Sequence, residues 1–164
     1  MKGKSFIAVF IILFCSMIIF GQEKPSWIIS FENNIKQKEA NLEIGKTGGV
    51  SLEGGFFNYF YRMTSGIDRI TILIRKDHDT PNRNKNASEK LFANSATLFE
   101  RTINRNVERK KLENLGDEGF IWTNFNKEGW TRIHFRKQDV FVEISASSEE
   151  TARRFSRYIV DEMP

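Results

Sequence analysis

Three short segments in the second half of the chain alternate apolar and polar residues, and this pattern constrains the fold most strongly. They span 120–124, 130–136 and 140–145, with turns at 126–129 and 137–139. In the middle segment one face would hold Thr131, Ile133 and Phe135, and the other Trp130, Arg132 and His134. Strands joined by turns this short run antiparallel, so the sequence predicts a meandering antiparallel sheet.

The remaining periodicities add helices and a hairpin. Helices are expected at 28–41, 86–104 and 148–162, a hairpin at 56–63 and 69–76, and a further strand at 107–112. The glycine-rich stretch 45–55 indicates a loop or a pair of turns. We therefore expect a single α+β domain over residues 22–164. Its one antiparallel sheet would have about five to six strands, covered on one face by two to three helices.

The first 21 residues have the anatomy of a secretory signal peptide. Lys2 and Lys4 precede an uncharged stretch from Phe6 to Phe20, which is shorter than the ~20 residues of a membrane-spanning helix. We expect cleavage after Gly21, with an uncleaved N-terminal anchor as the alternative and no membrane span after cleavage. The residue before Cys15 is Phe14 rather than a small residue, which argues against a lipid anchor. The Phe-Gly-Gln ending resembles signals of Bacteroidetes, so we expect a periplasmic or secreted bacterial protein.

Removal of that segment changes what the composition implies. The formal net charge of the whole chain is +4, and loss of Lys2 and Lys4 lowers it to +2. The single cysteine leaves with the segment, so the mature domain contains no thiol and no disulfide. Its basic residues are dispersed rather than gathered in one footprint. A nucleic-acid partner is therefore not expected.

Two short motifs lie in the second half of the chain: residues 115–120 read Leu-Gly-Asp-Glu-Gly-Phe, and residues 135–140 read Phe-Arg-Lys-Gln-Asp-Val. Through these motifs, residues 112–162 resemble a group of secreted or lipid-anchored bacterial α+β domains with no established activity. Those domains carry a Gly-Leu-Gly-Asp-Glu-Ala-aromatic element, then a strand ending in Arg-Lys-Gly-Asn, a strand of alternating valines and a terminal amphipathic helix. The matching stretches here are 115–120 and 135–140, with departures at Gly119, where alanine is usual, and at Gln138-Asp139, where Gly-Asn is usual. The resemblance implies an envelope domain and supplies no catalytic residue.

Five residues are candidates for a ligand-binding site: Asp117, Glu118, Trp130, Arg132 and His134. The two adjacent carboxylates lie between Gly116 and Gly119, which indicates either a turn or a cation loop; the spacing of a calcium-binding loop is absent. The other three alternate along one strand, on a face that we expect to be half-exposed. His78 stands in the polar loop 77–85 and has too few neighbours for a zinc site. No metal, cofactor or catalytic residue is predicted.

Two functions remain open. The first is a non-enzymatic envelope module that binds a partner protein or small ligand through an exposed sheet face, with an exposed patch of Tyr59, Tyr61, Trp122 and Trp130. The second is a small secreted hydrolase in which Asp117 or Glu118 acts as acid or base with His134, while Arg132 holds an anionic group. The sequence lacks a nucleophile elbow, a phosphate loop, an HExxH motif and a dinucleotide fingerprint, so the first is favoured.

Overall fold

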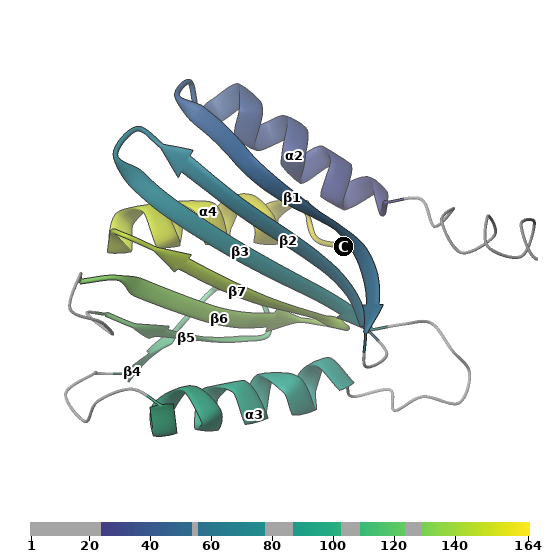
Figure 1. Cartoon of the computed structure of the whole chain (residues 1–164). Helices are drawn as coiled ribbons and strands as arrows, with labels where there is room; N and C mark the ends of the chain where they lie inside the picture. Colours follow the sequence, from purple (N-terminus) through teal and green to yellow (C-terminus); the bar gives the residue numbers. More distant parts are fainter. Residues whose placement is uncertain (1–23, 54–55, 78–86, 103–108, 124–128) are drawn as a thin grey trace, which may run out of the picture.

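A computed structural model describes residues 24–53, 56–77, 87–102, 109–123 and 129–164 (Figure 1). One helix and three strands come first, followed by a second helix, four more strands and a final helix. Their bounds are α2 Ser26–Lys38, β1 Leu42–Glu53, β2 Phe56–Ser65, β3 Asp68–Asp77, α3 Ala87–Thr102, β4 Arg109–Leu112, β5 Glu118–Trp122, β6 Thr131–Lys137, β7 Val140–Ala146 and α4 Glu149–Glu162.

All seven strands form one antiparallel sheet in the order β1-β2-β3-β7-β6-β5-β4. The α+β class and the single antiparallel sheet are confirmed, but the predicted number of strands was too low. The additional strand is β1, where the glycine-rich stretch had indicated a loop. β1 pairs with β2 through two register shifts, one around Gly45 and one after Gly48. Such bulges accommodate glycines that weaken a strand pattern in the sequence.

One face of the sheet packs against α2 and α4. The isoleucines Ile70, Ile72 and Ile74 of β3 are buried there, as are Tyr59 and Tyr61 of the neighbouring β2. From α4 come Ala152, Phe155 and Ile159, each 0% exposed, which form one apolar stripe along this helix. The principal core therefore lies between the sheet and these two helices.

The other face is packed against α3, so the prediction that helices cover only one face was wrong (Figure 1). The ring of Phe92 stacks on Phe120 at 5.5 Å and meets Phe141 edge-on at 6.3 Å. The strand residues Phe120 and Phe141 point away from the main core because successive strand residues alternate between the two faces. They need a second cover, and α3 provides it on the β3, β7 and β6 side of the sheet.

The predicted exposed aromatic patch is also contradicted. Tyr59 and Tyr61 are 3% and 2% exposed, and Trp122 is 0% exposed. Trp130 is half-buried and precedes β6 rather than belonging to it. Large aromatic side chains gain most from burial, so a sheet with helices on both faces encloses them.

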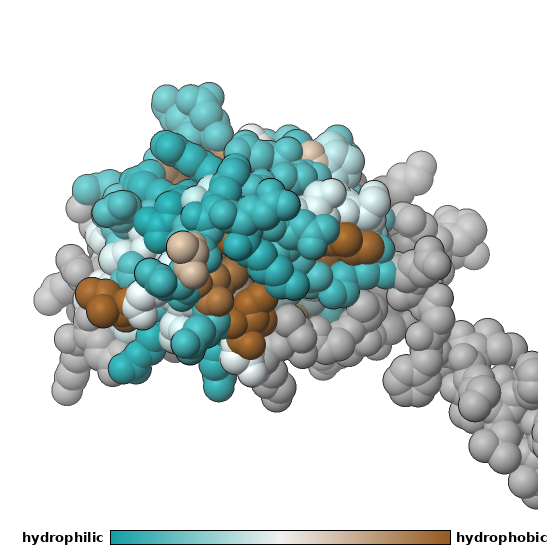
Figure 2. Space-filling view, turned by 90° about the horizontal axis from the view of Figure 1, so that it is seen from above, coloured by the Kyte–Doolittle hydropathy of each residue, from teal (hydrophilic) through white to brown (hydrophobic). Residues whose placement is uncertain are grey.

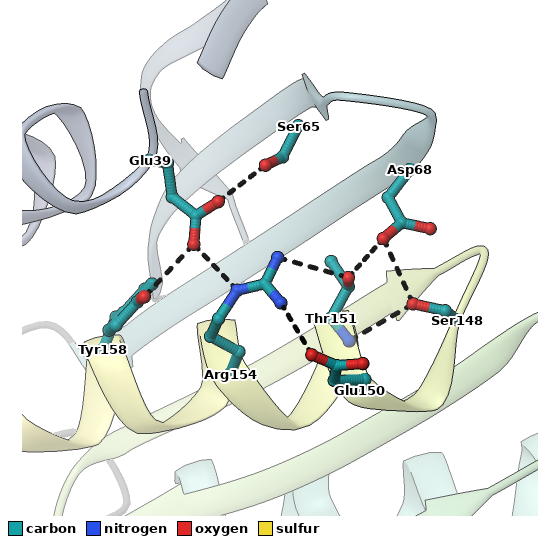
Figure 3. Close-up of polar contacts among 8 residues, drawn as sticks. All are labelled: Glu39, Ser65, Asp68, Ser148, Glu150, Thr151, Arg154 and Tyr158. Atoms are coloured by element: carbon teal, nitrogen blue, oxygen red, sulfur yellow. Dashed lines mark hydrogen bonds and ion pairs between the residues drawn. The ribbon is translucent and has the colours of Figure 1, made fainter. Parts of the chain in front are cut away.

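A polar network fastens the tip of the β2–β3 hairpin to α4 (Figure 3). The Asp68 carboxylate accepts hydrogen bonds from the hydroxyls of Ser147, Ser148 and Thr151. Burial alone would raise the pKa of Asp68, but these hydrogen bonds hold it below its ordinary value. The Ser148 hydroxyl also accepts from the Thr151 amide at 3.3 Å, which makes Ser148 the N-cap of α4.

Arg154 joins that network to the end of α2. Its Nε donates to Oε1 of Glu39 at 2.8 Å, and the hydroxyls of Ser65 and Tyr158 also donate to the Glu39 carboxylate. Burial alone would raise the pKa of Glu39, but these donors and the guanidinium charge lower it. The carboxylate therefore stays ionised while it holds three elements together.

Several predictions lie outside the described residues, including the signal segment and the loop residue His78. Within the described ranges no helix is long and apolar enough to cross a membrane. The view from above shows a mostly hydrophilic surface, with hydrophobic residues in small separate patches (Figure 2). The described part of that face is therefore not a broad apolar docking surface.

Candidate functional site

The sheet face that carries α3 holds nearly all the sequence-predicted strand candidates. Directly opposed residues in antiparallel strands share a face, so the pairings define rows across the sheet. One row contains, in order, Phe60, Leu73, Glu143, His134 and Phe120. The next row contains Arg62, Thr71, Ser145, Arg132 and Trp122. Charged side chains therefore occupy the middle of a face that also carries aromatic rings.

His134 lies beneath α3 and is only 1% exposed, so the predicted half-exposed histidine was wrong. The rings of Trp122 and Phe141 contact it edge-on, at 4.7 Å and 5.5 Å between centroids. Its Nε2 atom lies 3.1 Å from Oε2 of Glu143, and its Nδ1 atom lies 3.2 Å from the Ser95 hydroxyl. The alternation correctly placed His134 with Arg132, but the covering helix could not be read from the strand itself.

Burial lowers the pKa of His134 more than the neighbouring Glu143 carboxylate raises it. The imidazole is therefore neutral at neutral pH. Its Nε2 edge faces the carboxylate and its Nδ1 edge faces the Ser95 hydroxyl, and the donor and acceptor roles on the ring depend on the tautomer. The same hydroxyl lies 2.8 Å from the Phe92 carbonyl oxygen one turn earlier in α3. The contact between Ser95 and His134 therefore links α3 to β6, and aromatic rings surround it.

Serine, imidazole and carboxylate in contact form a nucleophile, base and orienting acid in the order used by serine hydrolases. Here, however, the imidazole is enclosed and the serine faces the sheet from α3. A substrate would have to enter between α3 and β6 to reach the Ser95 hydroxyl. We therefore interpret the group as a structural fastening of α3.

Glu143 lies near two guanidinium groups in this part of the face, those of Arg132 and Arg75. Arg132 approaches it at 3.4 Å and also donates from Nε to the Ser145 hydroxyl at 2.9 Å. Burial would raise the pKa of Glu143, but contact with His134 and the charges of Arg132 and Arg75 lower it. Arg75 acts at longer range, since its buried Nε has no hydrogen-bond acceptor among the described residues.

Asp117 and Glu118 belong to a different group, centred on Arg136. The Arg136 guanidinium lies 3.3 Å from Asp117 and 2.9 Å from Glu118, and Asp117 also accepts from the Gln138 amide at 2.7 Å. Gly116 has a φ of +66°, and a Cβ there would lie 2.3 Å from the Arg136 carbonyl oxygen. Asp117 therefore lies in the bend that Gly116 makes possible, and Glu118 begins β5. In the described contacts they pair with Arg136 rather than with His134, so the proposed hydrolase group is not assembled.

The part of this face over β2 and β3 is less covered than the part over β6. Arg62 is exposed, and Phe60, Thr71 and Leu73 are half-buried. Figure 1 looks onto this side of β1–β3, and no described helix crosses it. We call the residues Phe60, Arg62, Thr71, Leu73, Arg75 and Arg132 the open face.

The sequence analysis missed four residues that define these arrangements: Arg62, Arg75, Ser95 and Glu143. Glu143 could have been identified from the sequence, because it is the charged residue in the mostly apolar strand at 140–146. Arg62 and Arg75 could not have been identified in this way, since cationic residues are common on strand faces that meet solvent. Within the described residues, no three histidine, cysteine or acidic side chains are grouped closely enough to hold a metal ion.

Comparisons of the chain with protein-family models, with curated proteins and with solved structures found no match in any of the three. The resemblance of residues 112–162 to envelope domains therefore stays a prediction, and function has to be argued from the geometry above.

Proposed function

We propose that the protein is an exported, non-enzymatic binding module of the bacterial envelope. Its partner would be an acidic and partly apolar segment of another envelope protein, bound on the open face. The observation that supports this most directly is the charge balance of the open face. The open face carries three arginines and no acidic residue of its own; Arg62 is exposed, and Glu143, beside the face, lies 3.4 Å from Arg132.

The apolar residues of the open face define the rest of the partner. Phe60 and Leu73 are direct cross-strand partners, and both are half-buried. They lie one row from Arg62 and its partner Thr71. A segment with acidic side chains beside aliphatic ones would match both rows, with the carboxylates supplying orientation and the aliphatic groups supplying buried area.

Fluorescence anisotropy with a dye-labelled peptide of alternating glutamate and leucine tests this proposal. We expect saturable binding that weakens with salt, and about tenfold weaker binding by Arg62→Gln. Lys36→Gln is the matched control, because Lys36 is an exposed cation on α2 and its loss changes the net charge equally. Equal binding of a lysine–leucine peptide, or an unaltered affinity of Arg62→Gln, would contradict the proposal.

Export has its own test. Expression of the full chain in a Gram-negative host, followed by fractionation and N-terminal sequencing, should give a periplasmic or secreted protein that begins at Gln22. A full-length, membrane-associated product would instead support the uncleaved anchor.

The alternative of a small hydrolase would have to use the contacts among Ser95, His134 and Glu143, and labelling can separate the two functions. A fluorophosphonate probe reacts with activated serines. We expect no label on the native protein, because the imidazole is 1% exposed. Labelling that disappears in Ser95→Ala, but persists in Ser65→Ala, would favour the hydrolase.

A further inference from the structure

A hollow of about 190 Å³ lies between α4 and the loop that joins β4 to β5. Leu112, which is half-buried, and Leu115, which is 7% exposed, contribute apolar walls above the buried Ile133, and Asn114 and Ser156 contribute polar ones. Arg153 and Arg157 lie on the α4 side. The hollow lies on the α4 side of the sheet, so it is separate from the open face.

The two arginines of this hollow differ in their partners. Arg153 donates to the Glu149 carboxylate at 2.7 Å, one turn back in the helix. Arg157 is exposed and makes no ion pair with any described residue, although Asp161 follows one turn later and lies with it at a second hollow on α4. One guanidinium that makes no ion pair with a described residue, that of Arg157, therefore lies beside the walls formed by Leu112 and Leu115.

The hollow is smaller than the ~300 Å³ at which pockets for drug-sized ligands begin, and it corresponds to about six water molecules. An occupant would be small, with an apolar body beside Leu112 and Leu115. Its negative charge would be single, because only Arg157 lacks a partner and the exposed Glu113 at the rim opposes a second charge.

We propose that this hollow is a binding site for a small monocarboxylate, whose carboxylate pairs with Arg157. A guanidinium binds a carboxylate through two parallel N–H donors, and the Asn114 amide at the opposite wall offers another donor. The site is independent of the open face and of the acidic partner proposed for it.

Benzoate is the probe, and benzamide is its neutral counterpart of the same shape. Two-dimensional amide NMR of the mature protein should show saturable shifts at Asn114, Leu115 and Ile133 with millimolar benzoate. Benzamide should bind about tenfold more weakly, because it cannot form the ion pair. Arg157→Gln should weaken benzoate binding about tenfold, while Lys36→Gln should leave it unchanged.

Arg157 is exposed, so its replacement is not expected to disturb folding, and an unaltered circular dichroism spectrum confirms this. Equal affinities for benzoate and benzamide, an unaltered affinity of Arg157→Gln, or no saturable shift below about 50 mM benzoate would overturn the site. None of these outcomes bears on the open face, because peptide binding there is measured through Arg62.

Discussion

His134 and Glu143 are direct cross-strand partners, and their Nε2 and Oε2 atoms lie 3.1 Å apart beneath α3. The pair sits where an apolar helix contact would ordinarily be expected. Its position couples the ionisation of a buried imidazole to the docking of one helix. Changes at either residue should therefore affect the docking of α3 and the dependence of stability on pH.

Glu143→Gln should loosen α3 more than any other element. The neutral amide removes the carboxylate that orients His134 and that pairs with Arg132, so we expect a loss of about 1–3 kcal/mol in the free energy of unfolding. Urea denaturation measures the loss, and hydrogen exchange should show faster opening at α3 than at α4. Glu150→Gln, at a carboxylate with 89% side-chain exposure, is the control and should change stability little. Uniform loss of protection across all elements would count against a local role.

The protein should lose stability as the pH falls below about 6.5. The pKa of His134 in the folded state lies below its ordinary value of 6.5, so the unfolded chain binds this proton more readily. The contribution of the neutral imidazole is thus fully present above pH 6.5 and decreases as the pH falls towards the lower folded pKa. Urea midpoints measured between about pH 7.5 and pH 5.5 should fall less steeply in His134→Gln than in the native protein. Parallel slopes for the two proteins would show that His134 does not govern this range.

Glu39→Gln should destabilise the junction of α2, the hairpin tip and α4. The Glu39 side chain is 9% exposed and accepts from Arg154, so its replacement should cost about 1–3 kcal/mol. Glu149→Gln breaks an exposed pair with Arg153 and should cost less than about 0.5 kcal/mol. Because the pKa of Glu39 is lowered from 4.5, its contribution is present above pH 4.5 and is lost as the pH falls through the folded value. Similar costs for the two variants in chemical denaturation would refute the assignment.

Gly116→Ala should be much more harmful than Gly66→Ala, although both glycines have a positive φ near +60°. A Cβ at Gly116 would lie 2.3 Å from the Arg136 carbonyl oxygen, whereas nothing lies within 4 Å of a Cβ at Gly66. Backbone strain alone should cost about 1 kcal/mol at Gly66, and strain with the clash about 3 kcal/mol or more at Gly116. Thermal unfolding followed by circular dichroism compares the two. Equal midpoints would mean that the 115–119 turn adjusts freely.

Helices and strands could be predicted from the sequence where the pattern of apolar residues is complete within one short segment. The helix expected at 148–162 buries Ala152, Phe155 and Ile159, and the strand expected at 69–76 buries Ile70, Ile72 and Ile74. β1 was missed because its glycines hide the strand pattern, and its pairing depends on bulges opposite β2. The pairing of β3 with β7 joins segments that are distant in the chain, so local patterns do not report it.

The candidate site was predicted only in part, for a related reason. The alternation placed Arg132 and His134 on one face correctly, but exposure depends on what covers that face. α3 belongs to a different stretch of sequence, and its Ser95 reaches His134 only in the folded chain. Asp117 and Glu118 look like a functional pair in sequence, yet Arg136 neutralises them from the next strand.

The place of β7 in the sheet has a consequence for the order of assembly. It lies between β3 and β6, although it is the last strand to leave the ribosome or any export channel. Until residues 140–146 emerge, the hairpins of the two halves have no common neighbour, and β3 and β6 each present an unpaired edge. A chain that ends before Val140 should therefore aggregate or be degraded rather than fold as a smaller sheet, and completion of the fold should be slow because its decisive contacts are non-local.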